Sequence, residues 1–108
     1  MRLADVRRRL RGYDKASIHL KRHVTEEKCP YYGIPPGTVL ENLLNPRNLI
    51  RVSKTSININ EDKYKLYFRL SRQRILVVVA EFNEKLKVIT IYLVISRWQK
   101  RVVPVWKE

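Results

Sequence analysis

The two histidines of the chain, His19 and His23, lie four positions apart, with Lys21 and Arg22 between them. In the helix that we expect at 18–28, side chains with this spacing lie on the same side. Histidine suits proton transfer because its charge changes near neutral pH, and neighbouring cations stabilise the negative charge that develops on a reacting phosphate. Cleavage of RNA by its own 2′-hydroxyl needs such a combination, which makes His19 a candidate catalytic residue.

Two other interpretations of the histidines stay open. His23 borders the apolar side of the expected helix, which Leu20 and Val24 mark, so it also fits a packed residue of the core. The pair is also compatible with metal binding, but no third ligand is specified, because Glu26 and Glu27 are generic surface residues. We therefore expect no metal site.

The sequence lacks the motifs of cofactor-dependent enzymes. It has no glycine-rich phosphate loop, no H-E-x-x-H, no nucleophile elbow and no C-x-x-C. Cys29 is the single cysteine, which excludes an internal disulfide and a metal cluster of cysteines. We expect no cofactor.

The segment 64–70 alternates as a half-buried strand does. Its even positions are apolar or aromatic, and its odd positions are Lys65, Tyr67 and Arg69. If the even positions face the core, the other side presents a cation, an aromatic ring and a second cation. Such a surface is suited to phosphates and stacked bases, although an ordinary solvated sheet face has the same alternation.

The net charge of the chain favours an anionic partner. Its 23 lysines and arginines outweigh 10 acidic residues, giving +13, and the excess occurs in both the N-terminal and the C-terminal parts. Self-repulsion of this size opposes folding, and nucleic acid is the commonest partner that relieves it, ahead of anionic lipid or an acidic protein. The residues that we expect to bind nucleic acid are Lys21, Arg22, Lys65, Tyr67, Arg72 and Arg74.

Three helices are predicted in the first half of the chain. The first spans about 3–10 and is closed by Gly12, and the second spans 18–28, with Ser17 as its N-cap and Pro30 just beyond its end. The third ends at Asn45-Pro46, and begins either at the capping box Thr38–Glu41 or earlier, with Pro36 in its first turn.

Four strands are predicted in the second half, at 48–53, 64–70, 74–82 and 86–96. The first is expected at an edge and the third, apolar on both sides, in the centre. Short turns between the last three require antiparallel pairing. The expected fold is therefore α+β, a single domain 1–108 with the helices packed on one face of an antiparallel sheet of about four strands. The tail 97–108 is left unassigned.

Several short strings resemble the small RelE/BrnT-like proteins, in particular a branch with Ser-x-His in its first helix. They are Ser17 and His19, Gly33-Ile34, the segment 39–46, and the Val-x-Thr-x-Tyr of Val88, Thr90 and Tyr92. The resemblance covers roughly 15–96. It departs from the family in the longer segment 25–32 and in a C-terminus without the arginine-rich terminal helix of BrnT-like toxins.

This resemblance implies a RelE-like, toxin-type fold. Relatives are metal-independent ribonucleases, often paired with an antitoxin, and many members have no shown activity. They often work with arginine, lysine and tyrosine on strands, which adds Arg69 to the catalytic candidates. Arg97 joins them because it closes the last strand, where family members often place a functional arginine.

The sequence thus predicts an RNA-binding protein of this kind, which is either a metal-independent endoribonuclease of a toxin–antitoxin pair or a non-catalytic, basic nucleic-acid-binding module. A third option is an interaction protein whose cations meet an acidic partner. The expected partners are RNA or DNA, an acidic antitoxin and a second copy of the chain. A cytoplasmic location without membrane contact is expected, because the longest apolar runs are strand-sized and the N-terminal residues do not resemble a signal peptide.

Overall fold

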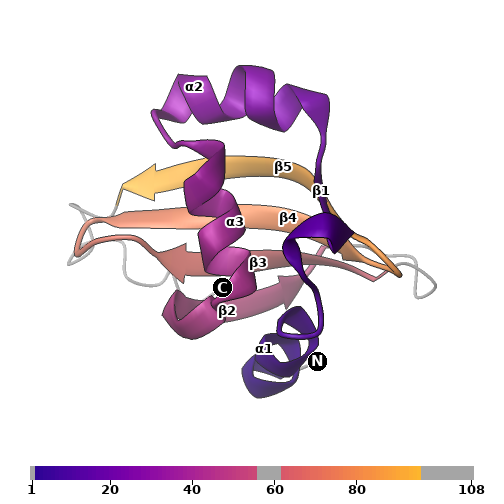
Figure 1. Cartoon of the computed structure of the whole chain (residues 1–108). Coiled ribbons are helices and arrows are strands. Elements are labelled where there is room, and N and C mark those ends of the chain that lie inside the picture. Colours follow the sequence, from indigo (N-terminus) through magenta and orange to yellow (C-terminus); the bar gives the residue numbers. More distant parts are fainter. Residues whose placement is uncertain (1, 56–61, 96–108) are drawn as a thin grey trace.

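The computed structural model describes residues 2–55 and 62–95 and has an α+β fold (Figure 1). Its helices and strands are α1 (Leu3–Leu10), β1 (Ile18–Leu20), α2 (Cys29–Tyr32), α3 (Pro36–Leu44), β2 (Leu49–Lys54), β3 (Lys63–Arg69), β4 (Arg74–Phe82) and β5 (Leu86–Ile95). Short 3-10 turns at Lys15–Ser17 and Pro46–Asn48 and a π-helical turn at Val24–Lys28 complete the described elements. No helix in the described ranges is long and apolar enough to cross a membrane.

The strands form one mixed sheet in the order β1-β5-β4-β3-β2. The pairs β2–β3, β3–β4 and β4–β5 are antiparallel, whereas β1 is parallel to β5. The prediction of four antiparallel strands is therefore confirmed for β2 to β5, with β4 in the centre and β2 at an edge. It is wrong in omitting the fifth, parallel strand.

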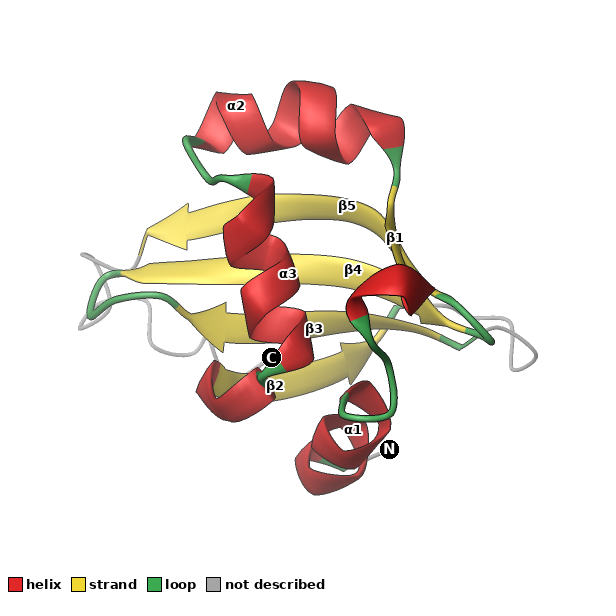
Figure 2. Cartoon of the chain, viewed as in Figure 1, coloured by secondary structure: helices red, strands yellow, loops and turns green. Residues whose placement is uncertain are grey.

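All the helices lie on one face of the sheet, as predicted, and α3 runs across the strands (Figure 2). The core forms between this face and the helices because the inward side chains of both are apolar and exclude water. Its helical members include Val6, Leu10, Val39 and Leu43, and its sheet members include Leu66, Phe68, Leu76, Val78, Leu86, Val88 and Ile91, all of them fully buried.

The predicted helix 18–28 is wrong at its start, where β1 forms instead. Ser17 does not cap a helix that follows it, because its side chain is turned back to Asp14. The Asp14 amide donates to Ser17 Oγ at 2.8 Å, and the Ser17 amide donates to Asp14 Oδ1 at 2.9 Å. This reciprocal pair closes the 3-10 turn, so the chain leaves it extended and Ile18–Leu20 hydrogen-bonds to β5.

Helical structure then occupies 22–32. The prediction that the helix ends before Pro30 is therefore wrong. The wider π-helical turn precedes the proline, which occupies the first turn of α2, where a missing amide hydrogen is tolerated. The end is set by Gly33, whose φ of 66° is left-handed, and the Ile34 amide donates to Cys29 O at 2.9 Å across it.

The third predicted helix is confirmed in its earlier-starting form. Helix α3 begins at Pro36, whose fixed φ and absent amide hydrogen suit a first turn, and Asn45 is its C-cap. Its apolar side is packed against the core through Val39 and Leu43.

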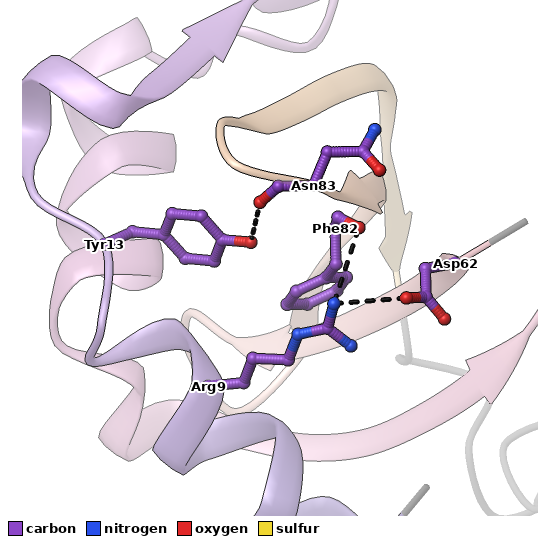
Figure 3. A network of polar contacts seen from close by, with 5 residues as sticks. All are labelled: Arg9, Tyr13, Asp62, Phe82 and Asn83. Atoms are coloured by element: carbon purple, nitrogen blue, oxygen red, sulfur yellow. Dashed lines mark hydrogen bonds and ion pairs between the residues drawn. The ribbon is translucent and has the colours of Figure 1, made fainter.

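A polar network fastens α1 and the segment after it to the end of the sheet where β4 turns into β5 (Figure 3). Arg9 Nη2 lies 3.1 Å from Asp62 Oδ2, and its guanidinium lies 4.9 Å from the centre of the Phe82 ring. The Tyr13 hydroxyl donates to Asn83 O at 2.6 Å. These contacts fix where the chain enters β1, and hence where His19 is placed.

Candidate nucleic-acid interface

The sheet face opposite the helices, called the outer face here, carries four transverse rows of side chains set by strand register. The first row joins His19, Lys87, Glu81 and Lys63 across β1, β5, β4 and β3. The second row is Ser53, Lys65, Val79 and Thr90, the third is Arg51, Tyr67, Val77 and Tyr92, and the fourth is Arg69, Ile75 and Val94. The first row is therefore polar throughout, whereas the β4 positions of the other three rows are apolar.

The side of the outer face over β2 and β3 is basic and is called the basic flank, comprising Arg51, Lys63, Lys65, Tyr67 and Arg69. The guanidinium carbon of Arg51 lies 5.7 Å from the centre of the Tyr67 ring, which is a cation–π distance. Arg69 is exposed, and its Nη1 donates a long hydrogen bond of 3.5 Å to Arg72 O. The predicted stripe of Lys65, Tyr67 and Arg69 is thus extended by cations on both sides.

The centre of the outer face is apolar and buried. Ile75 and Val77 on β4 are 2% and 0% exposed, although both point away from the helices. A ligand of the outer face in this conformation therefore contacts its margins, because the β4 positions in the middle are already buried.

A second group of cations lies at the opposite margin, over β1 and β5. His19 is the direct register partner of Lys87, and the Lys21 amide donates to Val88 O at 3.3 Å, which extends the parallel pairing one residue beyond β1. Alternation then puts Lys21 on the same face as His19. His19, Lys21 and Lys87 are all exposed, and they are called the corner cluster.

The predicted sharing of one helix side by the two histidines is wrong. His19 is on β1, whereas His23 is half-buried in the helical segment 22–32 and forms the N-cap of the π-helical turn. Arg22 begins that segment, and its Nε lies 2.8 Å from Glu26 Oε2 in an exposed ion pair. The two histidines therefore lie on different elements and do not share the side of one helix.

The predicted catalytic residues are spread out. His19 is in the first row and Arg69 in the fourth, which places them about 20 Å apart along the strands and about 14 Å apart across them. One scissile phosphate cannot contact both side chains. Arg97 lies outside the described residues. Arg72 is exposed in the β3–β4 turn, next to the Arg69 end of the basic flank. Arg74 is exposed at the start of β4, but alternation places it on the face of Leu76, which is the helix-bearing face.

Metal ligands do not gather in the described part of the chain: no three histidine, cysteine, aspartate or glutamate side chains there could hold an ion together. Cys29 is buried within the core, and this burial raises the pKa of its thiol. A protonated, enclosed thiol is a poor nucleophile and a poor ligand.

Lys87 and Arg51 were missed by the sequence reasoning. Lys87 is one lysine in an apolar strand, and it became a neighbour of His19 only through the parallel pairing of β1 with β5. Three residues are too few to show a strand period, so the sequence carried no signal for that pairing. Comparison of the chain with protein-family models, with curated proteins and with solved structures gives no match.

Proposed function

We propose that this protein binds RNA through the basic flank of the outer face. The observation that carries the proposal is the placement of Arg51, Lys65 and Arg69 around Tyr67 on two paired strands. The cations would neutralise backbone phosphates, and a base would stack on the ring of Tyr67.

Single-stranded RNA suits this surface better than a duplex. Unstacked bases can lie flat on an aromatic ring of a rigid sheet, whereas paired bases are hidden in their stack. The Arg51 guanidinium lies near the Tyr67 ring, so a base stacked on the tyrosine would also contact the arginine.

A second candidate is a metal-independent endoribonuclease, the activity implied by the resemblance to RelE/BrnT-like proteins. The adjacency of His19 and Lys87 favours it. In this scheme the 2′-hydroxyl attacks phosphorus, the bond to the 5′-oxygen breaks, and a 2′,3′-cyclic phosphate forms. His19 would accept the proton of the 2′-hydroxyl, a water molecule would protonate the departing 5′-oxygen, and Lys87 would stabilise the charge on the phosphorus oxygens. Arg69 would contact the RNA at a more distant phosphate.

Fluorescence anisotropy with a labelled single-stranded RNA of about 12 nucleotides tests the first proposal. We expect affinity to fall steeply with salt, and Tyr67→Ala and Arg69→Ala to weaken binding by about ten-fold each. Arg8→Ala is the matched control, because Arg8 is an arginine of equal charge on α1 with an 80% exposed side chain. Equal losses of RNA affinity in Arg8→Ala and Arg69→Ala would mean that net charge alone causes them, which would contradict the proposed interface.

A further inference from the structure

The corner cluster is built by the parallel pairing of two strands. Adjacent strands lie about 4.8 Å apart, so the side chains of register partners on one face are immediate neighbours. His19 and Lys87 are such partners, and Lys21 follows His19 on the same face about 6.6 Å along the strand. Three nitrogen donors therefore surround one small area of the surface.

The cluster is electrostatically unbalanced. The described carboxylate in its row is Glu81, which is in register with Lys87 on one side and with Lys63 on the other. Within 2–55 and 62–95, no hydrogen bond or ion pair occupies the side chains of His19, Lys21 or Lys87. Like charges held together without a dedicated partner repel one another, and an anion bound among them would relieve this repulsion.

The ligand that fits is a phosphate group. Its tetrahedral oxygens can accept hydrogen bonds from three separate donors at once, and lysine binds phosphate well as a compact charge. Strand β1 is the last strand of the described sheet on this side, and the three side chains are exposed, so a phosphate can approach from solvent.

We infer that His19, Lys21 and Lys87 form a phosphate-binding subsite. The inference deepens the proposed function, because RNA backbone phosphate would be the ligand, and it gives RNA a second contact across the sheet from the basic flank. The charged groups that face His19 are Lys87 on β5, Lys21 beyond β1, and Glu81 on β4 one strand further.

The first test uses inorganic phosphate and needs no RNA. Phosphate is titrated into the labelled protein at constant ionic strength, and backbone amide chemical shifts are followed by NMR, with chloride as the comparison anion. We expect saturable changes in the amide shifts, centred on residues 19–21 and 87. Changes that are equal with chloride, or that are absent at this corner, would overturn the inference.

Matched variants assign the donors. His19→Gln and Lys87→Gln should each weaken phosphate binding by about two- to five-fold at one fixed pH. His23→Gln is the control, since His23 is half-buried outside the cluster and its replacement should leave the phosphate affinity unchanged. Unchanged affinity in both His19→Gln and Lys87→Gln would contradict the subsite.

A measurement of RNA binding shows which of the two proposals fails, the phosphate subsite or the RNA-binding function on which it rests. If the protein binds phosphate at the corner but fails to bind single-stranded RNA, the proposed function fails and the subsite stands. If RNA binds with full affinity in His19→Gln and Lys87→Gln, and only Tyr67→Ala and Arg69→Ala weaken it, the subsite fails as an RNA contact and the basic flank stands.

Discussion

Tyr13 and Asn83 are 70 positions apart in the sequence, and the hydroxyl of the first donates a 2.6 Å hydrogen bond to the carbonyl oxygen of the second. The contact joins the segment before β1 to the β4–β5 turn. Burial raises the pKa of Tyr13, against the opposing effect of nearby Arg9. A phenol is protonated at neutral pH even at its ordinary value of 10.0, so Tyr13 remains a donor there.

Tyr13→Phe removes this donor while keeping the ring that lies 6.2 Å from Phe82. We expect the free energy of unfolding to fall by about 1 kcal/mol, because the replacement loses one hydrogen bond and little packing. Urea denaturation followed by circular dichroism measures the change. Tyr31→Phe is the control, since Tyr31 is 80% exposed and should lose almost nothing. Equal stability of the two variants would mean that the Tyr13 contact has no energetic role.

Arg7→Ala tests how α1 is attached to the sheet edge. Arg7 Nη2 donates to Leu49 O at 2.6 Å, and Arg7 Nε donates to Pro46 O at 3.2 Å. Hydrogen bonds from a charged donor are strong, so we expect a loss of about 1.5–3 kcal/mol in thermal or urea unfolding. Arg8→Ala removes an equal charge from an exposed position and should change stability by less than about 0.5 kcal/mol. A similar loss in both variants would assign the effect to helix propensity or net charge.

Alkaline pH should destabilise the fold through Cys29. Its pKa is raised by burial, so the unfolded chain loses the thiol proton first, at about its ordinary value of 9.0. The stability contributed by this group is therefore complete below that pH and is lost as the pH rises through the folded value. We expect Cys29→Ala to show a shallower decline of unfolding free energy between pH 8 and pH 10.5 than the unaltered chain. An equal decline of unfolding free energy in Cys29→Ala and in the unaltered chain would mean that Cys29 is not its cause.

Cleavage assays distinguish the two candidate functions. If the protein cuts RNA, products should end in a 2′,3′-cyclic phosphate or 3′-phosphate, and EDTA should have no effect. His19→Ala should then lower the cleavage rate by about a hundred-fold at saturating RNA. Arg69→Ala should weaken RNA binding and leave the saturated rate nearly unchanged, because Arg69 is too far from His19 to contact the same phosphate. Activity that EDTA abolishes and metal restores would contradict this mechanism.

The long strands were predictable from the sequence, because a run of apolar residues, or an alternation of apolar and polar ones, extends along each of them. Strand β4 has the predicted bounds, β3 is shifted by one residue, and the predicted side of Lys65, Tyr67 and Arg69 is the outer face. Strand β1 was not predictable in this way: three residues are too few for a period, and their partner lies far along the chain.

The arrangement of the candidate site depended on that missed strand. A helix at 18–28 would have paired His19 with His23, whereas the actual strand pairs His19 with Lys87. Sequence spacing fixes which residues share one element, but the distance from His19 to Arg69 depends on strand order and register, which are tertiary properties.

The parallel pairing of β1 with β5 also bears on how the chain acquires its fold. During synthesis, residues 18–20 emerge long before 86–88, so β1 has no strand to pair with until the last described strand has been made. The β2 to β5 hairpins can form from neighbouring segments, whereas docking of β1 closes a loop that spans most of the described chain. Such high-contact-order steps are slow, so the N-terminal segment should be the last to join the sheet, and His19 should reach Lys87 only when folding is complete.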